Sequence, residues 1–160
     1  MNLKSEINIL VVDDDIMLAD NLNEYLTKLG YNASAVYHGK EAVERFRQGD
    51  FHLVITDLVM PDMDGLELME AVKRIDKKAM VIVVTGHGSI ESAVTAIKKG
   101  AYDYISKPFR MEELDVIINR AFERYRLSRQ LGLFRGLSLA LMISIPVWLL
   151  LGIIMAIFLK

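Results

Sequence analysis

The sequence predicts an α/β domain in which helices cover both faces of a five-stranded parallel sheet. Short apolar runs end at polar residues, and a longer segment with apolar side chains at helical spacing follows each of them. The alternation occurs five times within roughly the first 125 residues. Strands and helices that alternate in this way form parallel sheets with right-handed crossovers, so both faces of the sheet are buried.

The expected strands share an apolar run that stops at a polar side chain. They lie at residues 7–12, 32–37, 53–57, 79–84 and 102–106. The run at 53–57 is central, because it ends at Asp57 and the chain is then broken by Pro61 and Gly65. Five strand–helix units of this size fit the doubly wound, flavodoxin-like strand order 2-1-3-4-5.

The expected helices follow the strands and carry recognisable start signals. Asp15 and Ser89 suit the N-caps of the first and fourth helices. The helices are expected at residues 16–29, 39–48, 66–74 and 90–99 and from residue 111 onward.

Helical spacing also predicts which side chains of these helices face the sheet. The expected set is Ile16, Leu18, Leu22, Tyr25, Leu26 and Leu29 on the first helix, Ala42, Val43 and Phe46 on the second, Leu66, Met69 and Val72 on the third, Ile90, Ala93, Val94 and Ile97 on the fourth, and Leu114, Ile117, Ile118, Ala121 and Tyr125 on the fifth.

Charge divides the chain into two parts. Residues 1–119 carry 13 basic and 20 acidic side chains, whereas residues 120–160 carry six basic side chains and one acidic one. An acidic domain is poorly suited to direct nucleic-acid binding, because the phosphates repel it. The chain has no cysteine, which excludes disulfides and thiolate metal sites. Its polar first residues give no secretory signal, so we expect the domain in the cytoplasm.

Reactive side chains stand at the ends of four strands, at the sheet edge where α/β proteins bind ligands. Asp13 and Asp14 follow the first strand, Asp57 ends the third, Thr85 follows the fourth and Lys107 follows the fifth. In the expected order these four strands are neighbours, and adjacent strands lie about 4.8 Å apart. We therefore expect the five side chains to meet in one patch.

The composition of this patch indicates phosphoryl transfer. Three close carboxylates repel one another and raise each other's pKa. A hard cation relieves this repulsion, and Mg²⁺ suits a site with few carboxylates and room for a phosphate. Lys107 adds a fixed positive charge, so phosphoryl oxygens would be stabilised during in-line transfer. Asp57 would be the nucleophile that forms an aspartyl phosphate, which the Thr85 hydroxyl could hydrogen-bond.

Each of these residues also has a purely structural interpretation. Aspartates after a strand commonly cap or begin a helix, and a lysine before proline or a threonine before glycine can simply end a strand. Asp62 and Asp64 precede Gly65 and are interpreted as turn residues without chemistry. Four strand ends with matching chemistry are harder to explain by chance than any single motif.

Four motifs around the patch resemble the receiver domain of two-component response regulators. They are Val11-Val12-Asp13-Asp14-Asp15, Asp57 with Met60-Pro61-Asp62-Met63-Asp64-Gly65, Thr85-Gly86, and Ala101-Tyr102-Asp103-Tyr104-Ile105-Ser106-Lys107-Pro108-Phe109. The resemblance covers residues 7–126, and residues 86–109 are most similar to receivers of the nitrogen-regulator class. It implies that Asp57 takes phosphate from the phosphohistidine of a sensor histidine kinase or phosphotransfer protein. Such a protein is not an enzyme acting on a separate substrate, because it catalyses only its own phosphorylation and dephosphorylation.

The resemblance also implies a ligand set for the metal. Asp14, Asp57 and the backbone carbonyl of Val59 would hold Mg²⁺, and Asp13 would act through water.

The same family pattern implies a switch. Thr85 and the ring of Tyr104 would move together, and the bond between Lys107 and Pro108 would be cis, which is plausible because it precedes proline. The output surface would be formed by the fourth helix, the fifth strand and the fifth helix, for contacts with other proteins or for a homodimer. Nitrogen-regulator-class proteins continue into an ATPase and a helix-turn-helix, which this sequence does not show, so direct promoter binding is not expected.

The C-terminal part of the chain predicts a membrane anchor. Residues 137–159 are 23 consecutive uncharged residues, within the roughly 17–25 that span a bilayer as a helix. A buried core helix is the alternative, but a complete five-unit domain has no spare surface to cover it. Arginines precede the span and only Lys160 follows it, which keeps the receiver on the cytoplasmic side. The expected organisation is a receiver domain at 1–126, a basic juxtamembrane helix extension at 127–136 and a single transmembrane helix at 137–159 in the inner (cytoplasmic) membrane. Small residues in the transmembrane helix would give the protein a second route to self-association.

Other functions compete with a membrane-anchored phosphoacceptor. One is a Mg²⁺-dependent aspartyl-phosphate phosphatase or phosphotransferase for small molecules. Enzymes of the haloacid-dehalogenase type have a second aspartate two residues after the nucleophile, where this chain has Val59. Another is a membrane scaffold that works without phosphorylation, which the intact patch disfavours. A flavin carrier is weaker still, because no phosphate-binding loop follows the first strand.

Overall fold

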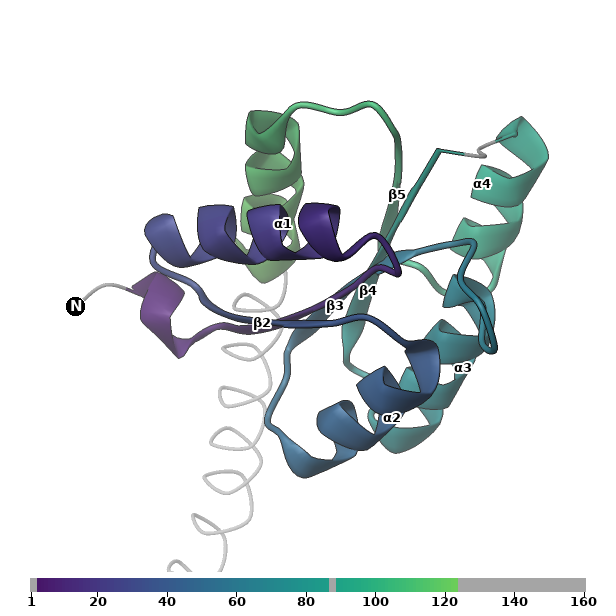
Figure 1. Ribbon diagram of the computed structural model, residues 1–160, viewed down its shortest axis with the longest axis horizontal. Coiled ribbons are helices and arrows are strands. Elements are labelled where there is room, and N and C mark those ends of the chain that lie inside the picture. Colours follow the sequence, from purple (N-terminus) through teal and green to yellow (C-terminus); the bar gives the residue numbers. More distant parts are fainter. Residues whose placement is uncertain (1–2, 87–88, 124–160) are drawn as a thin grey trace, which may run out of the picture. The chain divides into compact units, whose positions relative to one another are not determined.

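Five parallel strands form the sheet predicted from the sequence, in the order β2-β1-β3-β4-β5 (Figure 1). The computed structural model describes residues 3–86 and 89–123. The strands are β1 (Asn8–Val12), β2 (Asn32–Val36), β3 (Leu53–Asp57), β4 (Met80–Thr85) and β5 (Asp103–Ser106). All four strand pairs are parallel, which confirms the doubly wound arrangement.

The helices lie close to their expected positions. They are the short 3-10 helix η1 (Leu3–Glu6), α1 (Ile16–Lys28), α2 (Gly39–Gln48), α3 (Gly65–Ile75) and α4 (Ile90–Lys98), and a further helix that runs from residue 111 to residue 123, the last one described. Figure 1 shows α1 and the start of the last helix on one face of the sheet and α2 and α3 on the other, with α4 beside β5. The expected N-caps are confirmed, because the Asp15 side chain accepts a hydrogen bond from the Leu18 amide and Ser89 accepts one from the Ser92 amide.

The central strands are fully buried between the two helical layers. Every residue of β4 is buried, as are the first four residues of β3. Leu10, Val54 and Val81 are completely inaccessible, so the middle of the sheet is closed to water. A core this rigid fixes the positions of the strand ends that carry the polar residues.

The prediction for the inward face of α4 is wrong. Ile90, Val94 and Ile97 are 86 %, 44 % and 47 % exposed, and Ala96 is the one residue of α4 that is buried. The reason is the position of the helix, since α4 precedes β5, the edge strand of the sheet. Part of the apolar face of α4 therefore lies beyond the edge of the sheet, and the described residues (3–86 and 89–123) do not cover it.

Two smaller expectations are also corrected. Ile16 is 56 % exposed because it begins α1, and Ala19 is buried on this helix instead, together with Leu22 and Leu26. The helix α3 begins at Gly65, one residue earlier than expected.

No helix in the described part of the chain is both long and apolar enough to cross a membrane. The predicted span at 137–159 and the basic extension at 127–136 lie outside the described residues.

Candidate phosphoacceptor site

Strand register brings the predicted residues to one edge of the sheet. Val12 is paired with Thr56, so Asp13 and Asp57 come next to each other at the ends of β1 and β3. Asp57 is paired with Val84, which places Thr85 one step further along. Thr85 is paired with Ser106, and Lys107 follows. These positions, which stand far apart in the sequence, therefore lie at one edge of the sheet.

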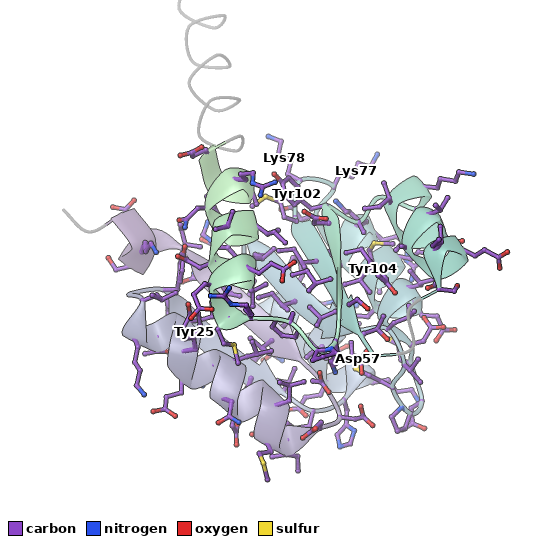
Figure 2. The ribbon with its side chains drawn as sticks, turned by 90° about the horizontal axis from the view of Figure 1, so that it is seen from above. Tyr25, Asp57, Lys77, Lys78, Tyr102 and Tyr104 are labelled. Carbon is purple, nitrogen blue, oxygen red and sulfur yellow. The ribbon has the colours of Figure 1, made fainter. Side chains whose placement is uncertain are left out.

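Lys107 joins the two central acids. Its Nζ lies 2.7 Å from Asp13 Oδ2 and 3.1 Å from Asp57 Oδ2, and it donates a hydrogen bond to each (Figure 2 labels Asp57). The Asp13 side chain is 4 % exposed and the Asp57 side chain 12 %. Charge-assisted hydrogen bonds at such a depth are stronger than the same bonds on the surface, so they orient both carboxylates.

Burial and the lysine act in opposite directions on the pKa of these groups. Burial raises the pKa of Asp13 above its ordinary value, although the hydrogen bonds from Lys107 and the Asp15 amide lower it. Burial also lowers the pKa of Lys107, but the hydrogen bonds and charges of Asp13 and Asp57 outweigh this, and the pKa lies above the usual lysine value. Lys107 is therefore a permanent cation at this edge.

The three carboxylates fit a hard divalent cation. One oxygen from each of Asp13, Asp14 and Asp57 lies within 4.8 Å of the others. Asp14 is exposed and Asp13 is buried, so the cluster faces both solvent and the interior. Oxygen donors at this spacing suit Mg²⁺, which keeps several waters and needs only one or two direct carboxylates. The Val59 carbonyl as a further ligand stays a prediction.

The backbone after Asp57 fixes the orientation of its carboxylate. Asp57 Oδ1 accepts a hydrogen bond from the Leu58 amide at 2.6 Å and a longer one from the Val59 amide at 3.4 Å. The Gly65 amide donates to the Leu58 carbonyl at 2.9 Å. A Cβ at Gly65 would overlap the Asp57 carbonyl oxygen. This close approach requires glycine, and it holds the start of α3 against the end of β3.

Thr85 and Tyr104, the predicted switch residues, lie on the neighbouring strands β4 and β5. Thr85 is fully buried at the end of β4, and its carbonyl accepts a hydrogen bond from the Lys107 amide at 2.8 Å. The Tyr104 hydroxyl lies 3.3 Å from Ser92 Oγ on α4; Figure 2 labels Tyr104. The Lys107–Pro108 peptide bond is cis, as the family pattern implied. A coupled movement of Thr85 and Tyr104 stays a prediction.

Three features of the site were not predicted from the sequence. The hydrogen bonds from the Leu58 and Val59 amides leave no sequence signal, because every residue except proline has a backbone N–H. The need for glycine at Gly65 depends on packing across the loop. The capping box of α3 did have a sequence signal, since Asp64 and Glu67 are three residues apart, as a capping box requires. In the structure, the side chain of each residue accepts a hydrogen bond from the backbone amide of the other.

The family follows from comparison with known proteins. A model of the response regulator receiver domain matches residues 9–119. The chain belongs to this family. Receiver domains of two-component response regulators bind Mg²⁺ at a cluster of acidic residues, which here are Asp13, Asp14 and Asp57.

Two related regulators are much longer than the segment that they share with this chain. The chain is 36 % identical over 123 residues to the transcriptional regulatory protein ZraR of Klebsiella oxytoca, covering 77 % of this chain and 28 % of that protein. It is 37 % identical over 133 residues to the nitrogen assimilation regulatory protein NtrX of Azorhizobium caulinodans, covering 82 % of this chain and 29 % of that protein. The receiver thus spans under a third of these two regulators.

Solved structures agree with this assignment. The beryllofluoride-activated NtrC4 receiver domain dimer superposes with a TM-score of 0.70 at 38 % identity, covering 74 % of this chain and 98 % of that one. A receiver domain protein from Clostridium thermocellum superposes with a TM-score of 0.72 at 32 % identity, covering 76 % and 98 % of the two chains. The match to nitrogen-regulator relatives agrees with the resemblance found in residues 86–109.

Proposed function

We propose that this receiver is a membrane-anchored phosphoacceptor that takes a phosphoryl group from a sensor histidine kinase or phosphotransfer protein onto Asp57. The observation that supports this most strongly is Lys107, whose ammonium bridges Asp13 and Asp57 at the mouth of a three-carboxylate cluster. This combination supplies a nucleophile, a fixed cation and a set of metal ligands within one small volume.

The residues perform separate parts of the transfer. The Leu58 amide and Lys107 hold the two oxygens of Asp57, so the carboxylate cannot rotate away from an incoming phosphoryl group. An Asp57 oxygen forms a bond to phosphorus while the phosphorus–nitrogen bond of the donor phosphohistidine breaks, and the electron pair of that bond returns to the imidazole. The Lys107 ammonium then neutralises phosphoryl oxygens, and the Thr85 hydroxyl hydrogen-bonds one of them.

Asp13, Asp14 and Asp57 would hold Mg²⁺ together with the Val59 carbonyl, and the bound ion would neutralise charge on the phosphoryl oxygens. Asp13 also keeps Lys107 in place, since its oxygen is the nearer partner of the ammonium. In this scheme the protein turns over no substrate of its own and only gains and loses a phosphoryl group.

Exposed apolar residues support a protein as the phosphoryl donor. Met17 is 76 % exposed and Ile16 is 56 % exposed at the start of α1, shortly after the metal-binding aspartates. Val59 is 53 % exposed two residues after Asp57. Exposed large apolar side chains around a polar site are a common mark of a surface that contacts another protein.

The apolar side chains of α4 support an output surface, with a homodimer as the first candidate. Ile90, Val94 and Ile97 are exposed on a helix that adjoins β5. The related NtrC4 receiver forms a dimer when activated by beryllofluoride. Sedimentation equilibrium with and without beryllofluoride tests this, because a charge in Val94→Glu should abolish any activated dimer that uses this face.

The membrane anchor and the inner-membrane location belong to the same proposal. They are supported by the uncharged run at 137–159 and the arginines before it. The acidic charge of residues 1–119 supports output through protein contacts, without direct contact to nucleic acid. Carbonate extraction of membranes from expressing cells tests the anchor, since an integral protein stays in the pellet.

Incubation of the full chain with acetyl phosphate and Mg²⁺, followed by intact mass measurement, tests the phosphoacceptor. One added phosphoryl group is expected, and none after chelation of the metal or in Asp57→Asn. Unchanged labelling of Asp57→Asn would contradict the proposal. Labelling by a phosphorylated histidine kinase domain then distinguishes a protein donor from a small one.

A further inference from the structure

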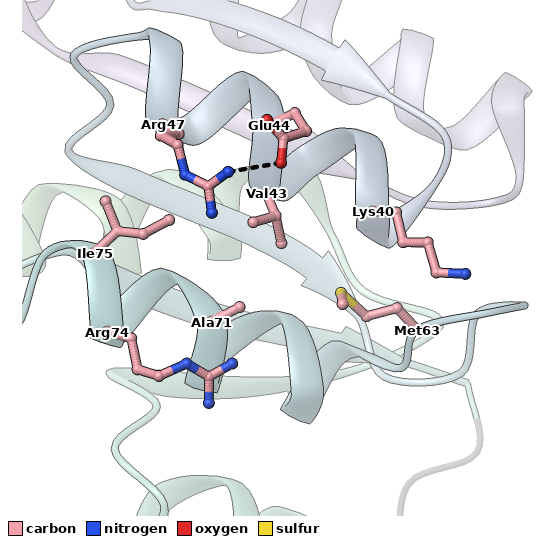
Figure 3. Close-up of a pocket in the computed structure, with 8 residues that line it drawn as sticks. All are labelled: Lys40, Val43, Glu44, Arg47, Met63, Ala71, Arg74 and Ile75. Carbon is pink, nitrogen blue, oxygen red and sulfur yellow. Dashed lines mark hydrogen bonds and ion pairs between the residues drawn. The ribbon is translucent and has the colours of Figure 1, made fainter.

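A groove runs between α2 and α3 and begins at Met63, in the loop that follows Asp57. Figure 3 shows side chains of the two helices facing each other across it, with Met63 at one end. Its volume is about 480 Å³. Val43 is partly buried in the groove, Ala71 is 7 % exposed, and Ile75 is 41 % exposed at the other end. The groove therefore has apolar walls that water still reaches.

Cations surround these apolar walls. Lys40 and Arg47 extend from α2 and Arg74 from α3, and all three are exposed (Figure 3). The acid that lines the groove, Glu44, already pairs with Arg47 at 2.7 Å. A groove with three cations and one paired carboxylate is unusual on this domain, because residues 1–119 carry 13 basic and 20 acidic side chains.

We infer that this groove docks an acidic, amphipathic helix of a partner protein. An amphipathic helix can place apolar side chains between two helices at positions i, i+3, i+4 and i+7. Carboxylates beside that apolar stripe would meet Lys40 and Arg74 on opposite sides of the groove. The inference does not depend on phosphorylation of Asp57.

The lining residues favour a protein helix over a small molecule. Small-molecule sites combine apolar walls with a few polar groups that converge inside the pocket. Here the four charged residues of the lining are all exposed, and the residues between them are apolar. Specificity would then come from the fit of apolar side chains into the groove and from opposite charges along its edges, as in other grooves that bind helices.

The charge and shape of the groove do not suit two other ligands, the chain's own C-terminal part and a membrane surface. The chain's own C-terminal part is an unsuitable ligand, since residues 120–160 carry six basic side chains and one acidic one. A bilayer surface is flat on this scale and would meet Lys40, Arg47 and Arg74 without filling the apolar space between them. An acidic helix satisfies both features at once.

The test uses a fluorescein-labelled synthetic helix with leucines at i, i+3, i+4 and i+7 and glutamates on both flanks. Fluorescence anisotropy measures its binding to the full 160-residue chain in a neutral detergent. Saturable binding is expected, weakened by salt because exposed charges are screened. The double variant Arg47→Glu/Arg74→Glu should weaken binding by about tenfold or more, and Ile75→Gln should weaken it several-fold. Circular dichroism confirms that each variant is folded.

The matched control is Lys28→Glu on α1. Lys28 and Arg47 are both exposed and both pair with a glutamate on their own helix, at 2.6 Å and 2.7 Å. The control should bind the peptide like the unchanged chain. The inference is overturned if the peptide shows no saturable binding, if a scrambled peptide of equal composition binds as well, or if Lys28→Glu weakens binding as much as the groove variant. It is also overturned if phosphatidylglycerol in mixed micelles, and not the peptide, shifts the NMR signals of Arg47 and Arg74.

Discussion

The helices α3 and α4 follow the same sequence rules and have opposite environments. Both begin with a capping box, formed by Asp64 and Glu67 in α3 and by Ser89 and Ser92 in α4. Both carry an apolar stripe. Yet α3 buries Leu68, Met69, Ala71 and Val72, whereas α4 buries Ala96 alone. A stripe therefore predicts that a helix has an apolar face, but not that the domain covers that face.

The difference has a functional meaning at the phosphoacceptor edge. The first residue of α3, Gly65, lies against the Asp57 carbonyl, and the helix is held by the packing of its buried side chains. The helix α4 begins five residues after Thr85 in the sequence and contacts Tyr104 through Ser92. A helix with little buried surface opens or shifts at low free-energy cost. We expect α3 to be the fixed support of the site and α4 the part that responds.

The largest effect should come from truncating the packing of α3. Leu68 is fully buried, so Leu68→Ala should lower the free energy of unfolding by about 2–5 kcal/mol. Val94→Ala on α4 should change it by less than about 0.5 kcal/mol, because Val94 is exposed. Urea unfolding followed by circular dichroism measures both. Equal losses in the two variants would contradict the contrast between the helices.

Substitution of a glycine should cost more stability at the start of α3 than before α4. In Gly65→Ala the new Cβ would overlap the Asp57 carbonyl oxygen, so we expect a loss of about 1–3 kcal/mol and slower labelling by acetyl phosphate. In Gly86→Ala, before α4, the nearest atom is Lys107 Cβ at 3.8 Å, an ordinary contact. A stable Gly65→Ala variant with normal labelling would show that the loop after β3 adjusts freely.

The sequence predicts the parts of this protein that depend on local rules and strand order. The strands, their order, the caps at Asp15 and Ser89 and the meeting of Asp13, Asp57 and Lys107 all follow from short-range patterns and the geometry of parallel sheets. The exposure of Ile90 was predicted wrongly, because periodicity is the same for a covered and an uncovered face. The groove between α2 and α3 could not be predicted, since it depends on the spacing of two helices.

Removal of the N-cap side chains should affect global unfolding at α3 and only local unfolding at α4. Asp64→Ala should lower the free energy of unfolding by about 1 kcal/mol, because α3 unfolds with the core. Ser89→Ala should mainly speed the hydrogen exchange of α4 amides and leave exchange in β4 unchanged. Hydrogen exchange with mass spectrometry reports both. The contrast fails if Ser89→Ala accelerates exchange in the core to the same extent as in α4.

The smallest expected effect on stability comes from an ion pair between α3 and the C-terminal end of α4. Among the described residues, Lys99 Nζ lies 2.8 Å from Glu70 Oε1. The hydrogen bond and charge of Lys99 lower the pKa of Glu70 below its ordinary value. The pair's contribution is therefore present above the unfolded-state pKa of Glu70 and is lost as the pH falls through the lowered folded-state pKa. NMR titration of the Glu70 carboxyl should show this lowered midpoint, and Lys99→Met should return it toward the ordinary glutamate value. An unchanged midpoint in Lys99→Met would mean that the pair does not form in solution.

The position of the phosphoryl group tests the account most directly. Aspartyl phosphate is an acyl phosphate, which borohydride reduces to homoserine, so tryptic peptides of the phosphorylated full chain can be sequenced by mass spectrometry after reduction. Homoserine should replace aspartate at position 57 and nowhere else, and Lys107→Ala should lower its yield while Lys98→Ala leaves it unchanged. Homoserine at position 13 or 14, or none in a chain that has gained a phosphoryl group, would contradict the assignment of Asp57.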